Sequence, residues 1–133
     1  MLKLEIVTPE KRIADTEADS VSVPTASGEA GILPNHAPLI SALKPGVLTY
    51  SNRSGTERIA IGGGFVEVNK DRVSVLADTA ETADEINAEQ ARFERDAAEK
   101  AIAEAIQRPV EETEDLRNRL ESANARLQLA SGK

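Results

Sequence analysis

The distribution of glycine and proline divides the chain near residue 80. All glycines except Gly132 and all prolines except Pro109 precede that point. Because both residues interrupt regular structure, the two parts of the chain must fold in different ways. We therefore expect two domains, residues 1–80 and residues 81–133.

The first part consists of short runs in which apolar residues alternate with polar ones. These runs lie at residues 2–7, 21–23, 39–43, 47–50, 58–61, 65–68 and 73–76. Turn residues separate these runs about every 8–12 positions, which is typical of an all-β sandwich or barrel. The connections leave no room for the helical crossovers of a parallel α/β sheet. We predict an antiparallel β-sandwich, with a core of Val, Ile, Leu and Ala because aromatic residues are only 2% of the chain.

The second part favours helix, because Ala, Glu and Arg dominate it. Thr82 and Glu85 fit a capping box, so the first helix is expected to start there and to run to about Gln107. Pro109 interrupts the pattern and suits the first turn of a second helix. The short break predicts an antiparallel two-helix hairpin, and the fold class is therefore mixed, β then α.

The second helix carries a narrow apolar seam that suits one partner helix. Its members recur every three or four residues: Leu116, Leu120, Ala123, Leu127 and Ala130. The first helix offers a comparable line of Ala91, Ala98, Ile102 and Ala105. Such a hairpin buries little surface, so we expect its packing to be conditional and reversible.

Composition excludes several classes of function. A net charge of −7 argues against nucleic acid as the main partner. The absence of cysteine excludes disulfides and thiolate metal sites. No run approaches the roughly 20 apolar residues that span a bilayer, so membrane association is expected only through partner proteins.

No motif indicates catalysis, a metal or a cofactor. A hydrolase would have to use His36, the only histidine, but the chain lacks a Gly-x-Ser-x-Gly nucleophile motif. Gly62, Gly63 and Gly64 precede a strand pattern rather than a helix, which favours a turn or bulge over a phosphate loop. The helix arginines either form a solvated face or meet an acidic partner, and composition leaves both readings open.

Three stretches, in order, resemble the ATP synthase epsilon family, called delta in mitochondria. They are residues 28–39 (GEAGILPNHAPL), 42–46 (ALKPG) and 63–68 (GGFVEV), the last followed by residues 73–80 (VSVLADTA). The resemblance implies a sandwich and a helix pair in a non-catalytic subunit of the central rotor stalk. Such a subunit links gamma to the c-ring in proton-driven ATP synthesis, at the cytoplasmic face of the bacterial inner membrane. A free-standing protein-binding adaptor or chaperone-like module is the alternative.

The resemblance also implies where partners bind. It places Glu29 against the polar loops of the c-ring and His36 at the boundary with gamma. In many bacterial members the helices extend and block ATP hydrolysis, with basic residues meeting an acidic segment of beta. Here the candidates for that contact are Arg117, Arg119 and Arg126.

Some family members bind ATP through an Ile/Leu-Asp-x-x-Arg-Ala motif at the start of the first helix. The matching positions here are Ile86, Asn87, Gln90 and Ala91. Asn87 replaces the acid and Gln90 replaces the arginine, so the motif is degenerate. We expect ATP binding to the isolated subunit to be weak or absent, and no other cofactor.

Overall fold

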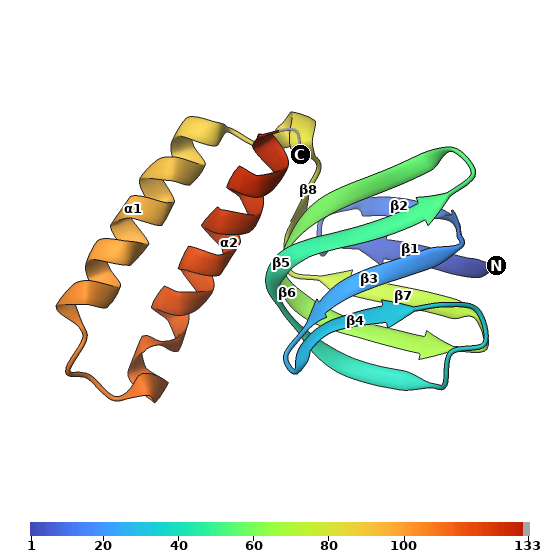
Figure 1. Ribbon diagram of the computed structural model, residues 1–133, viewed down its shortest axis with the longest axis horizontal. Helices are drawn as coiled ribbons and strands as arrows, with labels where there is room; N and C mark the ends of the chain where they lie inside the picture. Colours follow the sequence, from blue (N-terminus) through green and yellow to red (C-terminus); the bar gives the residue numbers. More distant parts are fainter. Residues whose placement is uncertain (132–133) are drawn as a thin grey trace.

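The computed structural model describes residues 1–131 as a β-sandwich with two helices packed against one side (Figure 1). The strands are β1 (Leu2–Val7), β2 (Arg12–Ala18), β3 (Ser20–Thr25), β4 (Gly28–Ile32), β5 (Leu39–Asn52), β6 (Gly55–Asn69), β7 (Arg72–Ala77) and β8 (Ala80–Glu81). The helices are α1 (Ala88–Glu104) and α2 (Glu114–Ala130), each preceded by a 3₁₀ turn, Ala83–Glu85 and Val110–Thr113. The predicted order, β then α, is confirmed.

One continuous sheet forms both layers of the sandwich. The strand order is β2-β1-β7-β6-β5-β3-β4, and β8 pairs with β6. Every pair is antiparallel except β1 with β7, which is parallel from Lys3 opposite Arg72 to Val7 opposite Leu76. The prediction of a wholly antiparallel sandwich is wrong for this pair. A parallel pair needs a long connection, and here intervening strands supply it instead of a helix.

The long strands β5 and β6 pass through both layers because they bend. We predicted breaks at Pro45–Gly46 and at Gly62–Gly64, but both stretches lie inside strands, so four expected strands merge into two. Gly63 and Gly64 adopt φ of +109° and +127°, which other residues rarely adopt. Before the bend β6 pairs with β8, and after it with β7. The glycines therefore redirect the strand rather than end it.

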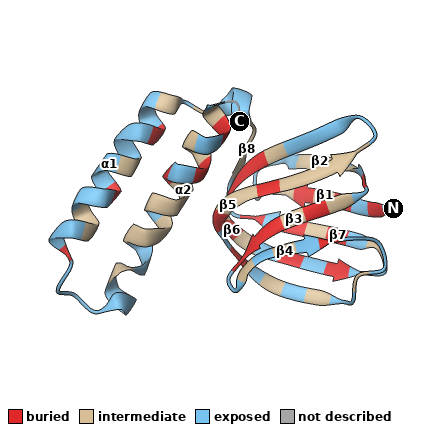
Figure 2. Ribbon diagram, in the orientation of Figure 1, coloured by how far each residue is buried: buried red, intermediate tan, exposed pale blue. Residues whose placement is uncertain are grey.

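The core of the sandwich is aliphatic, as the composition predicted. Its largest fully buried side chains are Leu2, Leu4, Ile6, Val21, Val23, Ile32, Leu48, Ile61, Val66, Val68, Val73 and Val75. Tyr50 is half-buried and packs against them. No helix residue belongs to this cluster within the described chain, and most buried positions in Figure 2 lie inside the sandwich.

The first helix starts and ends at different residues from those predicted. The capping box of Thr82 and Glu85 forms, but it caps the 3₁₀ turn Ala83–Glu85. The backbone is extended at Ile86, which packs on the cluster of Ala60, Ala125 and Leu129. Asn87 then caps α1, which ends at Glu104 rather than near Gln107. Packing of the half-buried Ile86 between sandwich and helix thus accompanies the later helix start.

Helix α2 lies between α1 and the sandwich (Figure 1). Ala91, Ala98 and Ala123, all on the predicted seams, are buried. The leucines of the α2 seam, Leu116, Leu120 and Leu127, are only half-buried. Sequence analysis missed a second contact face on α2, where Ala125 and Leu129 pack against Ala60 and Val47 of the sandwich.

The bend in β6 generates a stability prediction. A Cβ added at Gly64 would lie 2.0 Å from the Leu76 carbonyl oxygen, whereas one added at Gly55, with a similar φ of +128°, meets nothing within 4 Å. Gly64→Ala is therefore expected to lower the free energy of unfolding by about 1–3 kcal/mol more than Gly55→Ala, because it adds an overpacking cost to the same backbone cost. Urea denaturation of both variants measures the difference. Equal losses would show that the close packing at Gly64 does not matter.

Candidate functional site: docking surfaces and the helical arm

Glu29 lies on β4, at one edge of the sheet, and its side chain is exposed. The Ser22 hydroxyl donates a hydrogen bond to Glu29 Oε1, which orients the carboxylate. The preceding turn is held by the Thr25 hydroxyl, which donates to the Gly28 carbonyl, and Gly28 adopts a φ of +123°. The sandwich thus presents an oriented, solvent-facing carboxylate at its edge.

His36 lies in the loop that follows β4. Its backbone N–H donates to the Leu33 carbonyl over 3.1 Å, and its Nδ1 lies 2.6 Å from the Ala37 carbonyl oxygen. The Asn35 N–H donates to Asp71 Oδ1 over 2.7 Å, which ties the loop to the β6–β7 turn. No serine hydroxyl bonds to the imidazole in residues 1–131, so the geometry gives the hydrolase reading no support.

Three exposed apolar side chains form a patch on the outside of the sheet, here called the apolar face. Phe65 and Leu76 are cross-strand neighbours, each 58% exposed. Ile40 on β5, 74% exposed, lies on the same face diagonally from Phe65, since its direct cross-strand partner is Glu67. Large apolar side chains exposed together on one face mark interaction surfaces. Sequence reasoning missed the apolar face, although Phe65 and Leu76 alternate with buried valines and so had to point outward.

The residues of the degenerate nucleotide motif hold the start of α1. The Asn87 carboxamide oxygen accepts a hydrogen bond from the Gln90 N–H over 3.0 Å, as an N-cap does. Ala91 is buried against α2, Ile86 is half-buried and Gln90 is exposed. In the structure these side chains therefore cap and pack the helix.

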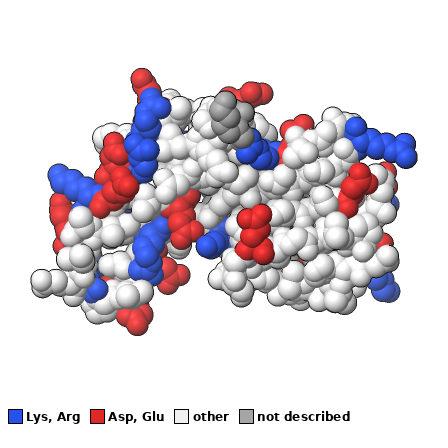
Figure 3. Space-filling model, viewed as in Figure 1, with Lys and Arg blue, Asp and Glu red and all other residues white. Residues whose placement is uncertain are grey.

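The three predicted arginines do not form one basic face. Arg117 donates to the Val110 carbonyl and to the Thr113 hydroxyl, so it braces the turn before its own helix. Arg119 is exposed. The Arg126 side chain is only 15% exposed and pairs with Glu81 and Glu94. Acidic and basic side chains are interspersed over the helices in Figure 3.

Ion pairs join the sandwich to the helical part. Lys11 lies 3.1 Å from Glu85, and Lys44 lies 3.8 Å from Glu121. The pKa of Glu85 is lowered, first by the hydrogen bond from the Thr82 backbone N–H and then by Lys11. These four charged side chains are all well exposed, so the pairs contribute little to stability.

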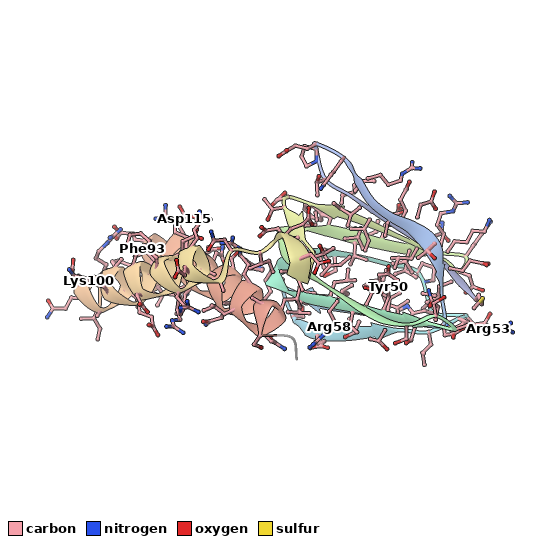
Figure 4. The ribbon with its side chains drawn as sticks, turned by 90° about the horizontal axis from the view of Figure 1, so that it is seen from above. Tyr50, Arg53, Arg58, Phe93, Lys100 and Asp115 are labelled. Carbon is pink, nitrogen blue, oxygen red and sulfur yellow. The ribbon has the colours of Figure 1, made fainter. Side chains whose placement is uncertain are left out.

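Two hollows accompany the helices. One, of about 400 Å³, lies between the sandwich and α2 and is lined by Thr8, Lys11, Thr79, Ser122 and Arg126 among others. The other, of about 410 Å³, lies between the helices and is lined by residues that include Phe93, Ala97, Arg119 and Ala123. Figure 4 shows Phe93 and Lys100 along the helical arm, and Arg53 at the far end of the sandwich.

Among residues 1–131, no group of three or more His, Asp or Glu side chains is placed to hold a metal ion. In the same range, no helix is both long and apolar enough to cross a membrane.

Comparison with known proteins identifies relatives over the whole chain. The β-sandwich domain family of ATP synthase delta/epsilon chains matches residues 1–83. An ATP synthase epsilon chain from Herpetosiphon aurantiacus is 45% identical over 97% of this chain and 93% of its own length. The corresponding chain from Moorella thermoacetica is 48% identical over 77% of this chain and 78% of its own length.

A solved structure agrees with these relatives. A chain in the cryo-EM structure of the Euglena gracilis mitochondrial ATP synthase, comprising OSCP, F1 and the c-ring, superposes with a TM-score of 0.76. The match is 25% identical and covers 98% of this chain and 81% of that chain.

Proposed function

Because this chain belongs to the ATP synthase delta/epsilon family, we propose that its sandwich links the gamma subunit to the c-ring in the rotating central stalk. The chain is a non-catalytic subunit, so its contribution is mechanical. The apolar face of Ile40, Phe65 and Leu76 is the observation that carries the proposal, because it is a ready docking surface on a rigid domain. The subunit would act at the cytoplasmic face of the bacterial inner membrane, held there by its partners.

The docking surfaces divide between the two partners. We assign the apolar face and the neighbouring His36 loop to gamma, since an extended interface needs an apolar centre. Glu29, an oriented and exposed carboxylate, is assigned to the polar loops of the c-ring. Both surfaces stand on strands of one core, which suits a part that must transmit torque without deforming.

If Glu29 and His36 are docking residues, we expect Glu29→Ala and His36→Ala each to leave the isolated chain folded and to weaken its assembly with gamma and the c-ring. Loss of one oriented charged or polar contact should reduce affinity about tenfold. Glu17→Ala, which removes an exposed carboxylate from the opposite edge strand β2, is the matched control. Circular dichroism checks the fold, and reconstitution with purified subunits measures assembly. Normal assembly of both folded variants would refute the assignment.

We propose further that residues 81–133 are a separable regulatory domain that inhibits ATP hydrolysis. The sandwich core uses residues between Leu2 and Ala77, whereas the apolar contact with α2 is a separate, smaller cluster built on Ala60, Ala125 and Leu129. Extension of the helices would carry Arg117, Arg119 and Arg126 toward an acidic segment of beta. Strand β8 spans the boundary, since Ala80 and Glu81 both pair with β6.

A chain ending at Ala83 tests this division, because it keeps β8 and removes both helices. We expect it to fold, to assemble and to support ATP synthesis, while ATP hydrolysis by the complex rises. The comparison requires complexes that differ only in this subunit and contain it in equal amounts. Equal hydrolysis rates with the full-length and truncated chains would show that the helices do not inhibit.

We propose also that the isolated subunit binds ATP weakly or not at all. Gln90 lacks the positive charge that an arginine would offer to phosphate, and the Asn87 carboxamide already caps the helix. The double variant Asn87→Asp/Gln90→Arg should gain about tenfold to a hundredfold in affinity, while Asp preserves the cap. Calorimetric titration of both chains measures this gain. Micromolar binding by the natural chain would contradict the proposal.

A further inference from the structure

Arg126 is the charged side chain that joins the three parts of the molecule. It lies on α2, its Nε is 2.8 Å from Glu81 Oε1 of β8, and its Nη1 donates a hydrogen bond to the Glu94 carboxylate of α1. Arg126 is only 15% exposed, compared with 33% for Glu81 and 47% for Glu94. One guanidinium therefore holds a carboxylate from the sandwich and another from the outer helix.

The geometry of the contact suits arginine in particular. The guanidinium presents donors in several directions of one plane, so two carboxylates bind to different edges. The Nε atom is buried and close to Glu81, but its N–H does not point at the oxygen, so this contact is an ion pair rather than a hydrogen bond. A lysine would offer one point charge and could not span both partners equally.

The other ionic contacts between the parts are more exposed than those of Arg126. Helix α1 packs mainly on α2, which separates it from the sandwich. The pairs Lys11–Glu85 and Lys44–Glu121 are exposed on both sides, so water and salt screen them. The apolar contact of α2 with the sandwich centres on Ala125 and Leu129. Arg126 is thus the best shielded ionic link between sandwich and helices in residues 1–131.

We propose that Arg126 is a clasp that sets whether the helices are docked on the sandwich, with separate branches to Glu81 and Glu94. The Glu81 branch ties the helix pair to β8, and the Glu94 branch ties α1 to α2. The clasp is built from the chain's own carboxylates. Because it concerns the isolated chain, it holds whether or not the helices inhibit hydrolysis.

Opening of the clasp has a measurable consequence. Each helix has 17 residues, and a helix of that length is marginal in water without tertiary packing. A helix that loses its docking therefore frays, and its backbone amides exchange with solvent faster. The branches predict different patterns: Glu94→Gln should speed exchange in α1 alone, whereas Glu81→Gln should speed it in both helices.

Hydrogen exchange measured by mass spectrometry on the full-length isolated chain tests the clasp. Arg126→Gln should speed exchange in α1 and α2 about tenfold or more, while the core strands β1, β6 and β7 keep their protection. Arg92→Gln is the control, the same change at an exposed position of α1, and should leave the exchange rates of both helices unchanged. The helix exchange rates of Arg126→Lys should lie between those of the natural chain and those of Arg126→Gln.

Two results would overturn the proposal. Equal helix exchange in Arg126→Gln and Arg92→Gln would show that the ion pairs do not hold the helices. Faster exchange throughout the core strands of Arg126→Gln would show that Arg126 serves global stability instead. A double variant Glu94→Gln/Arg126→Gln adds a direct measure, because coupled residues must give less than the product of the two single effects on α1. If the double variant instead shows the full product of the two single effects, Glu94 and Arg126 act independently, and the proposed Glu94 branch is wrong.

Discussion

The bend of β5 and β6 is the constraint on which the rest of the structure depends. Both strands run through two layers, and the turn between layers requires backbone that only glycine adopts easily, at Gly63 and Gly64. The Leu76 carbonyl lies so close to Gly64 that no side chain fits there. The same bend brings β7 and β8 onto successive parts of β6, so it closes the core and positions the strand that leads to the helices.

Contact between the sandwich and the helices has a different physical character from the core. The core excludes water with large aliphatic side chains, whereas α2 meets the sandwich through Ala125, Leu129 and charged pairs. Ala125 buries little area, so Leu129 supplies most of the apolar burial of α2 in this contact, and ion pairs depend on how well they are shielded. The sandwich thus has its own large core, and the helical arm joins it through a smaller apolar contact and ion pairs, which agrees with the roles proposed for each.

Much of this organisation was predictable because it is local. Alternation in residues 73–76 identified a strand, and the alanine and leucine spacing around Ala98 and Ala123 identified two helices that face each other. The docking residues Glu29 and His36 came from a resemblance in sequence, and their roles stay predictions. The apolar face was missed because Phe65 and Leu76 look like ordinary strand residues until their outward direction is combined with their pairing.

By itself, the sequence determined the change from strands to helices after about residue 80, the aliphatic character of the core and the helix pair, because composition and periodicity depend on neighbouring residues. Only the tertiary structure decided which strands pair, and so it revealed the parallel pair β1–β7 and the merging of four strands into two. It also decided that Ile86 packs, half-buried, against the sandwich before α1 begins, and that Arg126 meets Glu81 and Glu94. These contacts join residues far apart in the chain, and no local pattern encodes the partner of a distant strand or charge.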